Sequence, residues 1–418
     1  MVRIVLPSGL IVRNYRCFVG EHRVPLRKLT LVFGDNNTGK SALLRTLPLL
    51  AASAGGDHPG PLALGSEAAA GGGFDDLKTR LEIPGGDPQD LALGLEWDDP
   101  ALSWARFDFI RERREIRVRR LAVQTKTTQT FEWIPYKDGP LRFKEEGSTA
   151  RPEFELPFEG LRPRQHRGQP KATARVVAEL DTRLETLAES LIWLSGARVA
   201  PARRRPQPGG TPRHFSPDGH DAADFLFLDD DLRARVSRWY EEHLGRELWV
   251  REDPPHDFRV ALLKSEAGPV LVDLVDCGLG PIQVFPILVA LEVARRAESP
   301  RLLVLEEPES HLHPSLQRDL AHHFSTFVAN TEHRIVIETH SRAFFLGLQL
   351  AIVQGQLDPS DVLAVVVRSQ GERARSAIDI ATFDHEGYPD QKWPPHFFSD
   401  DQRLARDVLL ARKQAGGS

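Results

Sequence analysis

The chain has 418 residues, of which 41% are hydrophobic and 27% are charged, and this composition excludes a wholly disordered or membrane-embedded protein. The net charge of −5 excludes a uniformly basic nucleic-acid binder, so contact with DNA or RNA would need local basic patches. Two cysteines, Cys17 and Cys277, are too few for a disulfide framework, and no apolar run is long enough to span a bilayer. We therefore expect a globular, cytoplasmic protein without membrane contact.

Near the N-terminus, an apolar stretch at residues 29–33 leads into a glycine-rich loop. The loop matches the pattern G-x-x-x-x-G-K-[ST] with Gly34, Asp35, Asn36, Asn37, Thr38, Gly39, Lys40 and Ser41. Residues 41–50 follow with leucines on one helical face. In such a loop the backbone N–H groups surround a phosphate, the lysine reaches the β and γ phosphates, and the serine hydroxyl ligates Mg²⁺. The pattern therefore predicts a nucleotide site that involves every residue of the loop.

Residues 51–269 lack a comparable motif. Between residues 77 and 159, β-like runs separated by Gly, Pro and Asp predict an antiparallel meander. Residues 172–192 carry leucines at helical spacing, which predicts either a helix packed on the core or a short projecting arm.

From residue 280 onward, predicted helices and strands alternate, which is typical of a parallel α/β sheet. The apolar strand at residues 302–305 ends in Glu306 and Glu307, and the strand at residues 334–337 is followed closely by His340. Because parallel strands end at the same edge of a sheet, these side chains would meet the phosphate loop.

The strand-end positions predict the roles of these side chains. Glu306 would join Ser41 in the shell of the Mg²⁺ ion, whereas Glu307 would orient or deprotonate the attacking water. His340 would contact the γ-phosphate. We therefore predict that Lys40, Glu307 and His340 are catalytic in ATP hydrolysis, with ATP and Mg²⁺ as cofactors. A GTP-binding module would need a Lys-x-Asp motif to read the base, and this motif does not occur in the chain.

Three stretches together resemble the ABC-class ATPase heads of the SMC, RecF and OLD-like group. Residues 33–41 resemble the Walker A motif, residues 305–314 resemble Walker B running into the D-loop, and residues 338–341 resemble the switch-histidine motif. The resemblance implies an α/β fold, namely an ABC-type P-loop ATPase head with an antiparallel β sub-domain and an inserted β/helical region. A long coiled coil is not expected, because the predicted helix in the middle of the chain is far too short.

The positions of these motifs imply a division of the chain. The ATPase core would be discontinuous and would consist of residues 1–50 and 270–370. Residues 51–269 would form a β-rich and helical insertion that includes the helix near 172–192. Residues 371–418 would form a C-terminal extension, whose stretch 393–398 resembles the extension of related ATPases.

The segment before the acidic strand occupies the place of the ABC signature. The resemblance implies that Gly278, Gly280 and Gln283 bind the ATP of a partner subunit, in a homodimer or higher even-numbered oligomer with ATP sandwiched between its heads. Similar sequences carry Ser where this chain has Ile282, so the contact would rest on backbone amides, and an inactive scaffold stays open as an alternative. Residues 194–201 resemble a strand of the family, and the resemblance implies that their arginine, Arg198, lies near the nucleotide.

Proteins of this appearance often belong to bacterial anti-phage defence pairs, in which an ATPase acts with a nuclease or another effector. The resemblance implies an ATP-hydrolysing switch that controls a separate effector or nuclease subunit, and a RecF- or SMC-like ATPase of DNA repair or chromosome maintenance is the alternative. Residues 365–371 lack the acidic residues of the Toprim nuclease domain that OLD-like proteins append, so we expect any nuclease on another chain. The basic stretches 111–120 and 203–205 would either contact DNA or RNA or form a solvated surface.

Overall fold

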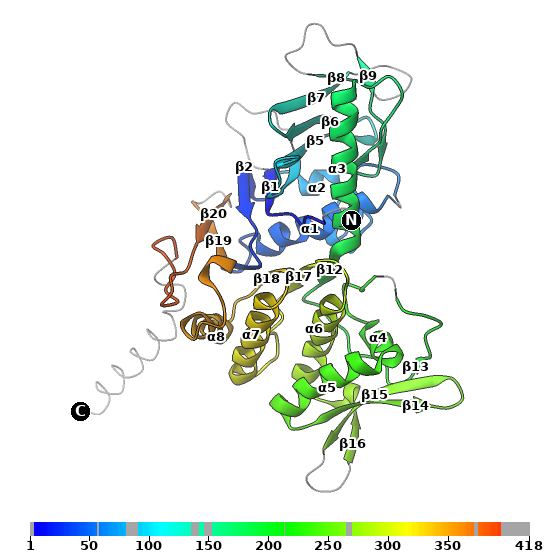
Figure 1. Cartoon of the computed structure of the whole chain (residues 1–418), viewed down its shortest axis with the longest axis vertical. Coiled ribbons are helices and arrows are strands. Elements are labelled where there is room, and N and C mark those ends of the chain that lie inside the picture. Colours follow the sequence, from blue (N-terminus) through cyan, green and yellow to red (C-terminus); the bar gives the residue numbers. More distant parts are fainter. Residues whose placement is uncertain are drawn as a thin grey trace, which may run out of the picture.

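The computed structural model describes residues 4–56, 58–80, 91–134, 142–145, 153–212, 214–264, 270–371 and 375–393. A 6-stranded sheet lies at the centre, in the order β12-β17-β18-β3-β19-β20 (Figure 1). Neighbouring strands are parallel, except that β20 runs antiparallel to β19 at one edge. In chain order the strands are β3 (Leu29–Gly34), β12 (Leu191–Leu194), β17 (Leu302–Glu306), β18 (Arg334–Glu338), β19 (Val362–Gln370) and β20 (Arg375–Ala381).

Both faces of the central sheet are covered, which explains why its strands read as continuous apolar runs. Along β17, Leu302 and Val304 face one core cluster, whereas Leu303 and Leu305 face the other. This alternation follows from the two-residue period of a strand. The sheet therefore separates two hydrophobic cores, and functional side chains are left to the ends of its strands.

One face is covered by helix α1 (Lys40–Gly55) and by an 8-stranded antiparallel sheet, in the order β2-β1-β4-β5-β6-β7-β8-β9. Its first two strands precede the phosphate loop in the chain, so the predicted meander is extended by the N-terminal segment. The strands are β1 (Gly9–Tyr15), β2 (Phe18–Pro25), β4 (Leu91–Glu96), β5 (Trp104–Glu112), β6 (Glu115–Gln124), β7 (Thr128–Ile134), β8 (Arg142–Glu145) and β9 (Phe154–Glu155). The short elements nearby are η1 (Glu67–Ala69), α2 (Phe74–Leu77), β10 (Phe158–Glu159) and β11 (Arg162–Pro163).

Helix α3 (Lys171–Ser190) packs on this half of the molecule and does not project as an arm. Figure 1 shows the helix running alongside the strands β5 to β8. Leu180, Leu184 and Leu187 are fully buried in the same cluster as α1 and the antiparallel sheet. The helix continues directly into β12, which pairs with β17 in the central sheet. The stretch that we predicted as an insertion therefore contributes one strand to the core, and the division into core and insertion stays a proposal.

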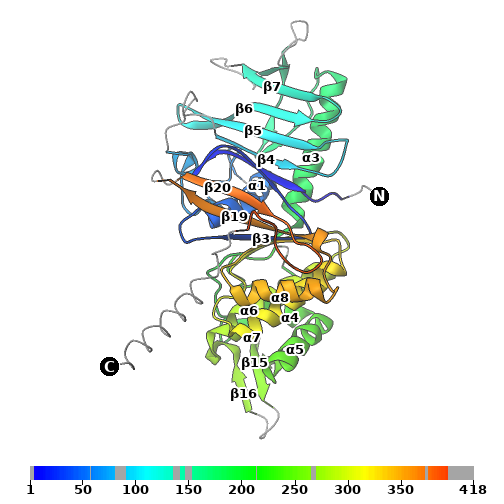
Figure 2. The ribbon, with the colours of Figure 1, turned by 90° about the vertical axis from the view of Figure 1, so that its left-hand side faces the viewer.

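The other face is covered by α6 (Leu279–Arg295), α7 (Pro314–Ala329) and α8 (Arg342–Val353). Figure 2 shows these helices at the end of the molecule opposite the strands β4 to β7. The remaining elements of this half are α4 (Ala222–Leu228), α5 (Asp230–Leu244), η2 (Leu274–Asp276), η3 (Pro359–Asp361), and a 4-stranded sheet of β13 (Arg205–Pro206), β14 (Glu247–Asp253), β15 (Asp257–Lys264) and β16 (Val270–Asp273). Among the described residues, no helix combines the length and apolarity needed to cross a bilayer. Residues 394–418 of the predicted C-terminal extension lie outside the described residues.

Candidate nucleotide-binding site

The carboxyl ends of β3, β17 and β18 meet at one edge of the central sheet. The ladder places Glu306 directly beside Glu338, and Glu338 directly beside Val32 near the end of β3. Sequence-predicted side chains from the two ends of the chain are therefore brought together, as expected from the parallel pairing. Binding at this edge is the general behaviour of open α/β sheets.

Two glycines give the phosphate loop its shape. A Cβ atom on Gly34 would lie 2.2 Å from the carbonyl oxygen of Val367, so only glycine lets the loop pass β19 so closely. Gly39 has a φ of +96°, and a Cβ there would lie 2.3 Å from the Cys17 sulfur. The helix α1 begins at the next residue, so its N-terminal N–H groups face the loop, where an anion is stabilised.

Side chains from distant segments hold the loop in this shape. The Thr38 hydroxyl donates to the carbonyl oxygen of Asp35 over 2.9 Å. The carbonyl oxygen of Thr38 accepts a 2.6 Å hydrogen bond from the Ser376 hydroxyl on β20 and a weaker one from the Cys17 thiol. Asp35, Asn36 and Asn37 remain exposed at the tip of the loop. The loop is therefore fixed at its base and open to solvent where a phosphate would enter.

Lys40 is folded back across the loop. Its Nζ atom donates to the carbonyl oxygen of Asp35 over 2.5 Å, and the side chain is largely buried. Burial lowers the pKa of Lys40, while Glu338, Asp35 and Glu307 oppose this effect by their negative charges. The ammonium group thus lies within a ring of acids and carbonyl oxygens, and a phosphate would replace the carbonyl contact.

Ser41 is paired with a different carboxylate from the one predicted. Its hydroxyl donates to Oε1 of Glu338 over 2.8 Å. Glu338 is only 3% exposed, and its other oxygen, Oε2, is buried and has no hydrogen-bond partner within the described part of the chain. Burial is the largest cause that raises the pKa of Glu338 to about 7, and the negative charges of Glu306 and Glu307 add to it.

Glu306, which we predicted to join Ser41 at the metal, is held by other donors. Arg45 donates from Nε to Oε1 over 2.7 Å and from Nη2 to Oε2 over 2.6 Å. The Trp193 indole adds a 3.2 Å bond to Oε1, and the Gly196 amide adds a 3.3 Å bond to Oε2. The pairing has a physical reason: Arg45 lies one helical turn after Ser41 on α1, and its bidentate pair with Glu306 is stronger than a neutral hydroxyl contact. The metal role expected for Glu306 stays a prediction.

Glu307 has an unusual backbone conformation. Its φ is 43°, in the left-handed region that non-glycine residues rarely adopt, at a cost of about 1 kcal/mol. The conformation is held because the Glu307 N–H donates to the carbonyl oxygen of Glu338 over 2.8 Å. The Ser310 hydroxyl donates to Oε2 of Glu307 over 2.9 Å and fixes the carboxylate. Strain that is maintained in this way is typical of a functional position.

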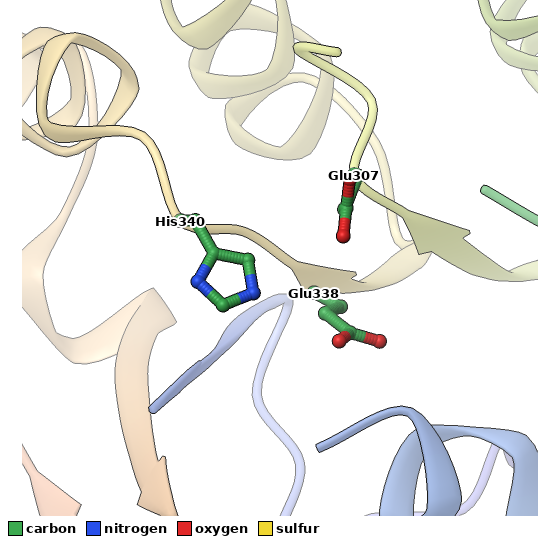
Figure 3. A group of neighbouring side chains, drawn as sticks. All are labelled: Glu307, Glu338 and His340. Atoms are coloured by element: carbon green, nitrogen blue, oxygen red, sulfur yellow. The ribbon is translucent and has the colours of Figure 1, made fainter. Parts of the chain in front are cut away.

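His340 lies beside the two carboxylates Glu307 and Glu338 (Figure 3). One ligand atom from each of the three side chains lies within 4.8 Å of the others. Burial, and then the charge of Lys40, lower the pKa of the His340 ring, so it is neutral at pH 7. A neutral imidazole can donate or accept a hydrogen bond at a phosphate oxygen or at the attacking water.

A buried carboxylate that the sequence reasoning missed positions His340. Oε1 of Glu309 accepts from the Thr339 hydroxyl over 2.6 Å and from the His340 N–H over 3.1 Å. Burial raises the pKa of Glu309. The only signal in the sequence was its place in the stretch that resembles the D-loop.

Arg198 lies near the site and contacts backbone carbonyl oxygens. Its guanidinium is buried and donates to the carbonyl oxygens of Glu306 and Glu307 over 2.7 and 2.8 Å, and to those of Ser195 and Gln283 over 3.0 and 3.1 Å. Burial lowers its pKa to about 10, so it remains charged at neutral pH. Arg198 thereby joins the end of β17 to the start of α6, and the nucleotide contact implied by the resemblance stays a prediction.

The signature segment is divided between surface and core. Gly278 is exposed just before the first turn of α6, whereas a Cβ on Gly280 would lie 3.0 Å from the carbonyl oxygen of His311. The Gln283 amide donates to the carbonyl oxygen of Arg198 over 2.8 Å and is buried. Ile282, in the first turn of α6, is 4% exposed and packs into the core. Of the residues predicted to reach a partner's ATP, Gly278 is therefore the one that faces solvent.

Comparison with known proteins places these features in a family. Residues 29–346, well over half of the chain, match the family described as "AAA domain, putative AbiEii toxin, Type IV TA system". No protein of curated function matches the sequence.

Solved structures of SMC heads are similar in outline. They include an SMC head bound to the C-winged helix domain of ScpA, with 12% identity, 91% of this chain and 98% of that chain covered, and a TM-score of 0.46. The SMC head domain from Thermotoga maritima has 11% identity, 90% and 98% coverage, and a TM-score of 0.43. An Smc head with an extended coiled coil, bound to the C-terminal domain of ScpA derived from Pyrococcus furiosus, has 9% identity, 90% and 96% coverage, and a TM-score of 0.47.

The family match spans the phosphate loop, the acidic end of β17 and His340, which the fold brings together at one edge of the central sheet. The chain belongs to this AAA-domain family, and its phosphate loop lies at the carboxyl edge of a largely parallel sheet.

Proposed function

We propose that this chain binds ATP with Mg²⁺, hydrolyses the γ-phosphate, and uses the cycle of binding and hydrolysis to control a partner effector. The observation that carries the proposal is the meeting of the phosphate loop with Glu307, Glu338 and His340 at the strand ends. The loop supplies N–H groups and Lys40 for the phosphates. Mg²⁺, when bound, neutralises charge that develops on the phosphates.

The residues around Glu307 support its role as the group that orients or deprotonates water. Ser310 fixes its carboxylate, and Arg198 and the carbonyl oxygen of Glu338 fix its backbone. His340 lies beside it with a neutral ring, held from behind by Glu309. A positioned carboxylate of this kind contributes about 10²–10⁴-fold to a hydrolysis rate.

The face that carries the site supports closure of two heads on ATP. Leu279, at the start of α6, is 56% exposed beside Gly278. Leu346 is exposed on α8, where it lines a groove of about 510 Å³ together with Glu307 and His340. A second protein surface that closed over this groove would bury Leu346 next to Glu307 and His340. A homodimer, or a higher even-numbered oligomer, would provide that cover.

For the effector we keep a nuclease or another protein of a bacterial anti-phage defence pair, with a RecF- or SMC-like role in DNA repair or chromosome maintenance as the alternative. The family's description mentions a Type IV TA system, which suits a chain that acts together with a second component. Direct contact with DNA or RNA has less support. Arg203, Arg204 and Arg205 each form an ion pair with an aspartate, so their charges are already balanced.

The substitution Glu307→Gln tests the proposal. The variant should bind ATP as tightly as the parent and lose at least about 100-fold in steady-state phosphate release, because an amide cannot take a proton from water. ATP should also double its mass in light scattering, since the closed state would persist. Glu298→Gln, the same change on an exposed residue, is the matched control. Normal turnover by Glu307→Gln would show that another group activates the water.

A further inference from the structure

The two acidic strand ends offer two carboxylates for one Mg²⁺ ion, and the contacts differ sharply between them. We infer that Glu338, and not Glu306, is the carboxylate that joins Ser41 in holding the Mg²⁺ of bound ATP, while Arg45 retains Glu306 as a structural anchor. The inference rests on the proposed ATP site and names the residues that hold its metal.

The first support is the position of Ser41. Its hydroxyl, the metal ligand expected from the loop pattern, lies 2.8 Å from Oε1 of Glu338. Two oxygen ligands of one cation lie about this close to each other, since each is 2.0–2.1 Å from a Mg²⁺ ion. Mg²⁺ generally takes one or two protein ligands and completes its shell with phosphate oxygens and water. Ser41 and Glu338 are sufficient on the protein side.

The second support is the unsatisfied oxygen of Glu338. Oε2 is buried and has no hydrogen-bond partner among the described residues, and only 3% of the residue is exposed to solvent. A buried acceptor in this condition costs free energy unless a cation or a donor reaches it. Lys40, a cationic group of the loop, donates to the carbonyl oxygen of Asp35. A hard cation with a preference for oxygen fits the vacant acceptor.

The third support is the engagement of Glu306. Arg45 holds both of its oxygens, and the Trp193 indole and the Gly196 amide add a donor to each. For Glu306 to reach a metal, the Arg45 pair would have to break within a largely buried site. Glu338 needs no such rearrangement. Among the described residues, the Ser41 hydroxyl is the one hydrogen-bond donor to its carboxylate, and that hydroxyl would itself turn to the metal.

The test compares the effect of Mg²⁺ on ATP affinity in three variants with that in the parent. The protein is titrated into a fluorescent ATP analogue, and binding is followed by fluorescence anisotropy in about 5 mM Mg²⁺ or in EDTA, at about 0.1 M salt. The ratio of the two dissociation constants measures the coupling between metal and nucleotide and does not depend on turnover. In Glu338→Gln this ratio should fall about tenfold or more, the loss expected when a metal-shell contact is removed. Glu306→Gln and the exposed control Glu298→Gln should keep the ratio of the parent.

The outcomes separate the inference from the proposed function. Loss of the Mg²⁺ effect in Glu306→Gln, with Glu338→Gln unchanged, overturns the inference while leaving the ATP site intact. A parent that binds no ATP in either buffer overturns the proposed function and the inference with it. A fourth variant, Ser41→Ala, should lower the same ratio, as Glu338→Gln does. Thermal unfolding of each variant confirms that the folded protein is being compared.

Discussion

The ends of β17 and β18 carry the same residue type in paired positions, yet the two carboxylates have opposite surroundings. Glu306 accepts hydrogen bonds from Arg45, Trp193 and Gly196. Glu338 accepts one from Ser41, and its other, buried oxygen has no partner in the part of the chain that the structure describes. A position in a motif therefore does not define a role on its own. The donors that reach each carboxylate decide which one stabilises the fold and which one is available to a ligand.

This difference separates stability from function within one sheet edge. A fully hydrogen-bonded, ion-paired carboxylate fixes α1, the helix that follows the phosphate loop, against the end of β17. A buried carboxylate with a free oxygen destabilises the ligand-free protein and is maintained for what it binds. Substitutions at the two positions should therefore change stability in opposite directions.

The largest effect on stability is expected from Arg45→Met, which leaves the buried Glu306 carboxylate without its charge partner. The free energy of unfolding should fall by about 3–5 kcal/mol, as measured by urea denaturation. The double variant Arg45→Met/Glu306→Gln removes the unpaired charge and should recover about half of this loss or more. A loss below about 1 kcal/mol in the single variant would show that the pair does not anchor the strand.

The next largest effects are expected from Glu338→Gln and Glu306→Gln in EDTA at pH 8, and these two variants should change the free energy of unfolding in opposite directions. Glu338→Gln removes a buried charge and should raise the free energy of unfolding by about 1–3 kcal/mol. Glu306→Gln weakens the contact with Arg45 and should lower it by a similar amount. Urea denaturation of both variants beside the parent measures the difference. A change of the same sign in the free energy of unfolding of both variants would contradict the difference between the two carboxylates.

The pH dependence sharpens the same contrast. The pKa of Glu338 is about 7 in the folded protein, above the ordinary value of 4.5. Between these two pH values the folded chain keeps a proton that the unfolded chain has lost, so this group stabilises the protein below about pH 4.5. That contribution is lost as pH rises through about 7, with a slope of up to about 1.4 kcal/mol per pH unit. In EDTA, the stability difference between Glu338→Gln and the parent should therefore grow between pH 5 and 8, and a constant difference would contradict the assignment.

The smallest effect on stability is expected from Ser41→Ala. It removes a single partly buried hydrogen bond to Glu338, so the free energy of unfolding in EDTA should change by about 1 kcal/mol or less. Differential scanning calorimetry in EDTA measures this change. A loss as large as that of Arg45→Met would mean that Ser41 has a structural role, like that of Arg45.

The phosphate loop and the strand ends could be predicted because local patterns determine them. Gly34 and Gly39 mark the loop, and an apolar run that ends in acids marks β17. The choice of partner could not be predicted, since Ser41 and Glu338 are separated by 297 positions and Arg45 and Glu306 by 261. One signal was available in the sequence. Arg45 follows Ser41 by four positions, so the two residues must lie on the same face of the helix.

The contacts of residues that support the site without facing it could not be predicted from the sequence either. The guanidinium of Arg198 could be placed near the nucleotide by resemblance, but its four carbonyl acceptors come from three segments that only the fold brings together. The bounds of strand β12 could not be predicted for a similar reason. It is a short apolar continuation of α3, and its partner β17 lies more than a hundred positions later in the chain.

The central claim is tested most directly by a crystal structure of the chain with Mg²⁺ and a non-hydrolysable ATP analogue. The account predicts the analogue's phosphates in the loop at residues 34–41, with the Ser41 hydroxyl and the Glu338 carboxylate in the metal shell and Glu306 still paired with Arg45. A structure in which Glu306 has left Arg45 and contacts the metal, while Glu338 faces away from it, would contradict the account.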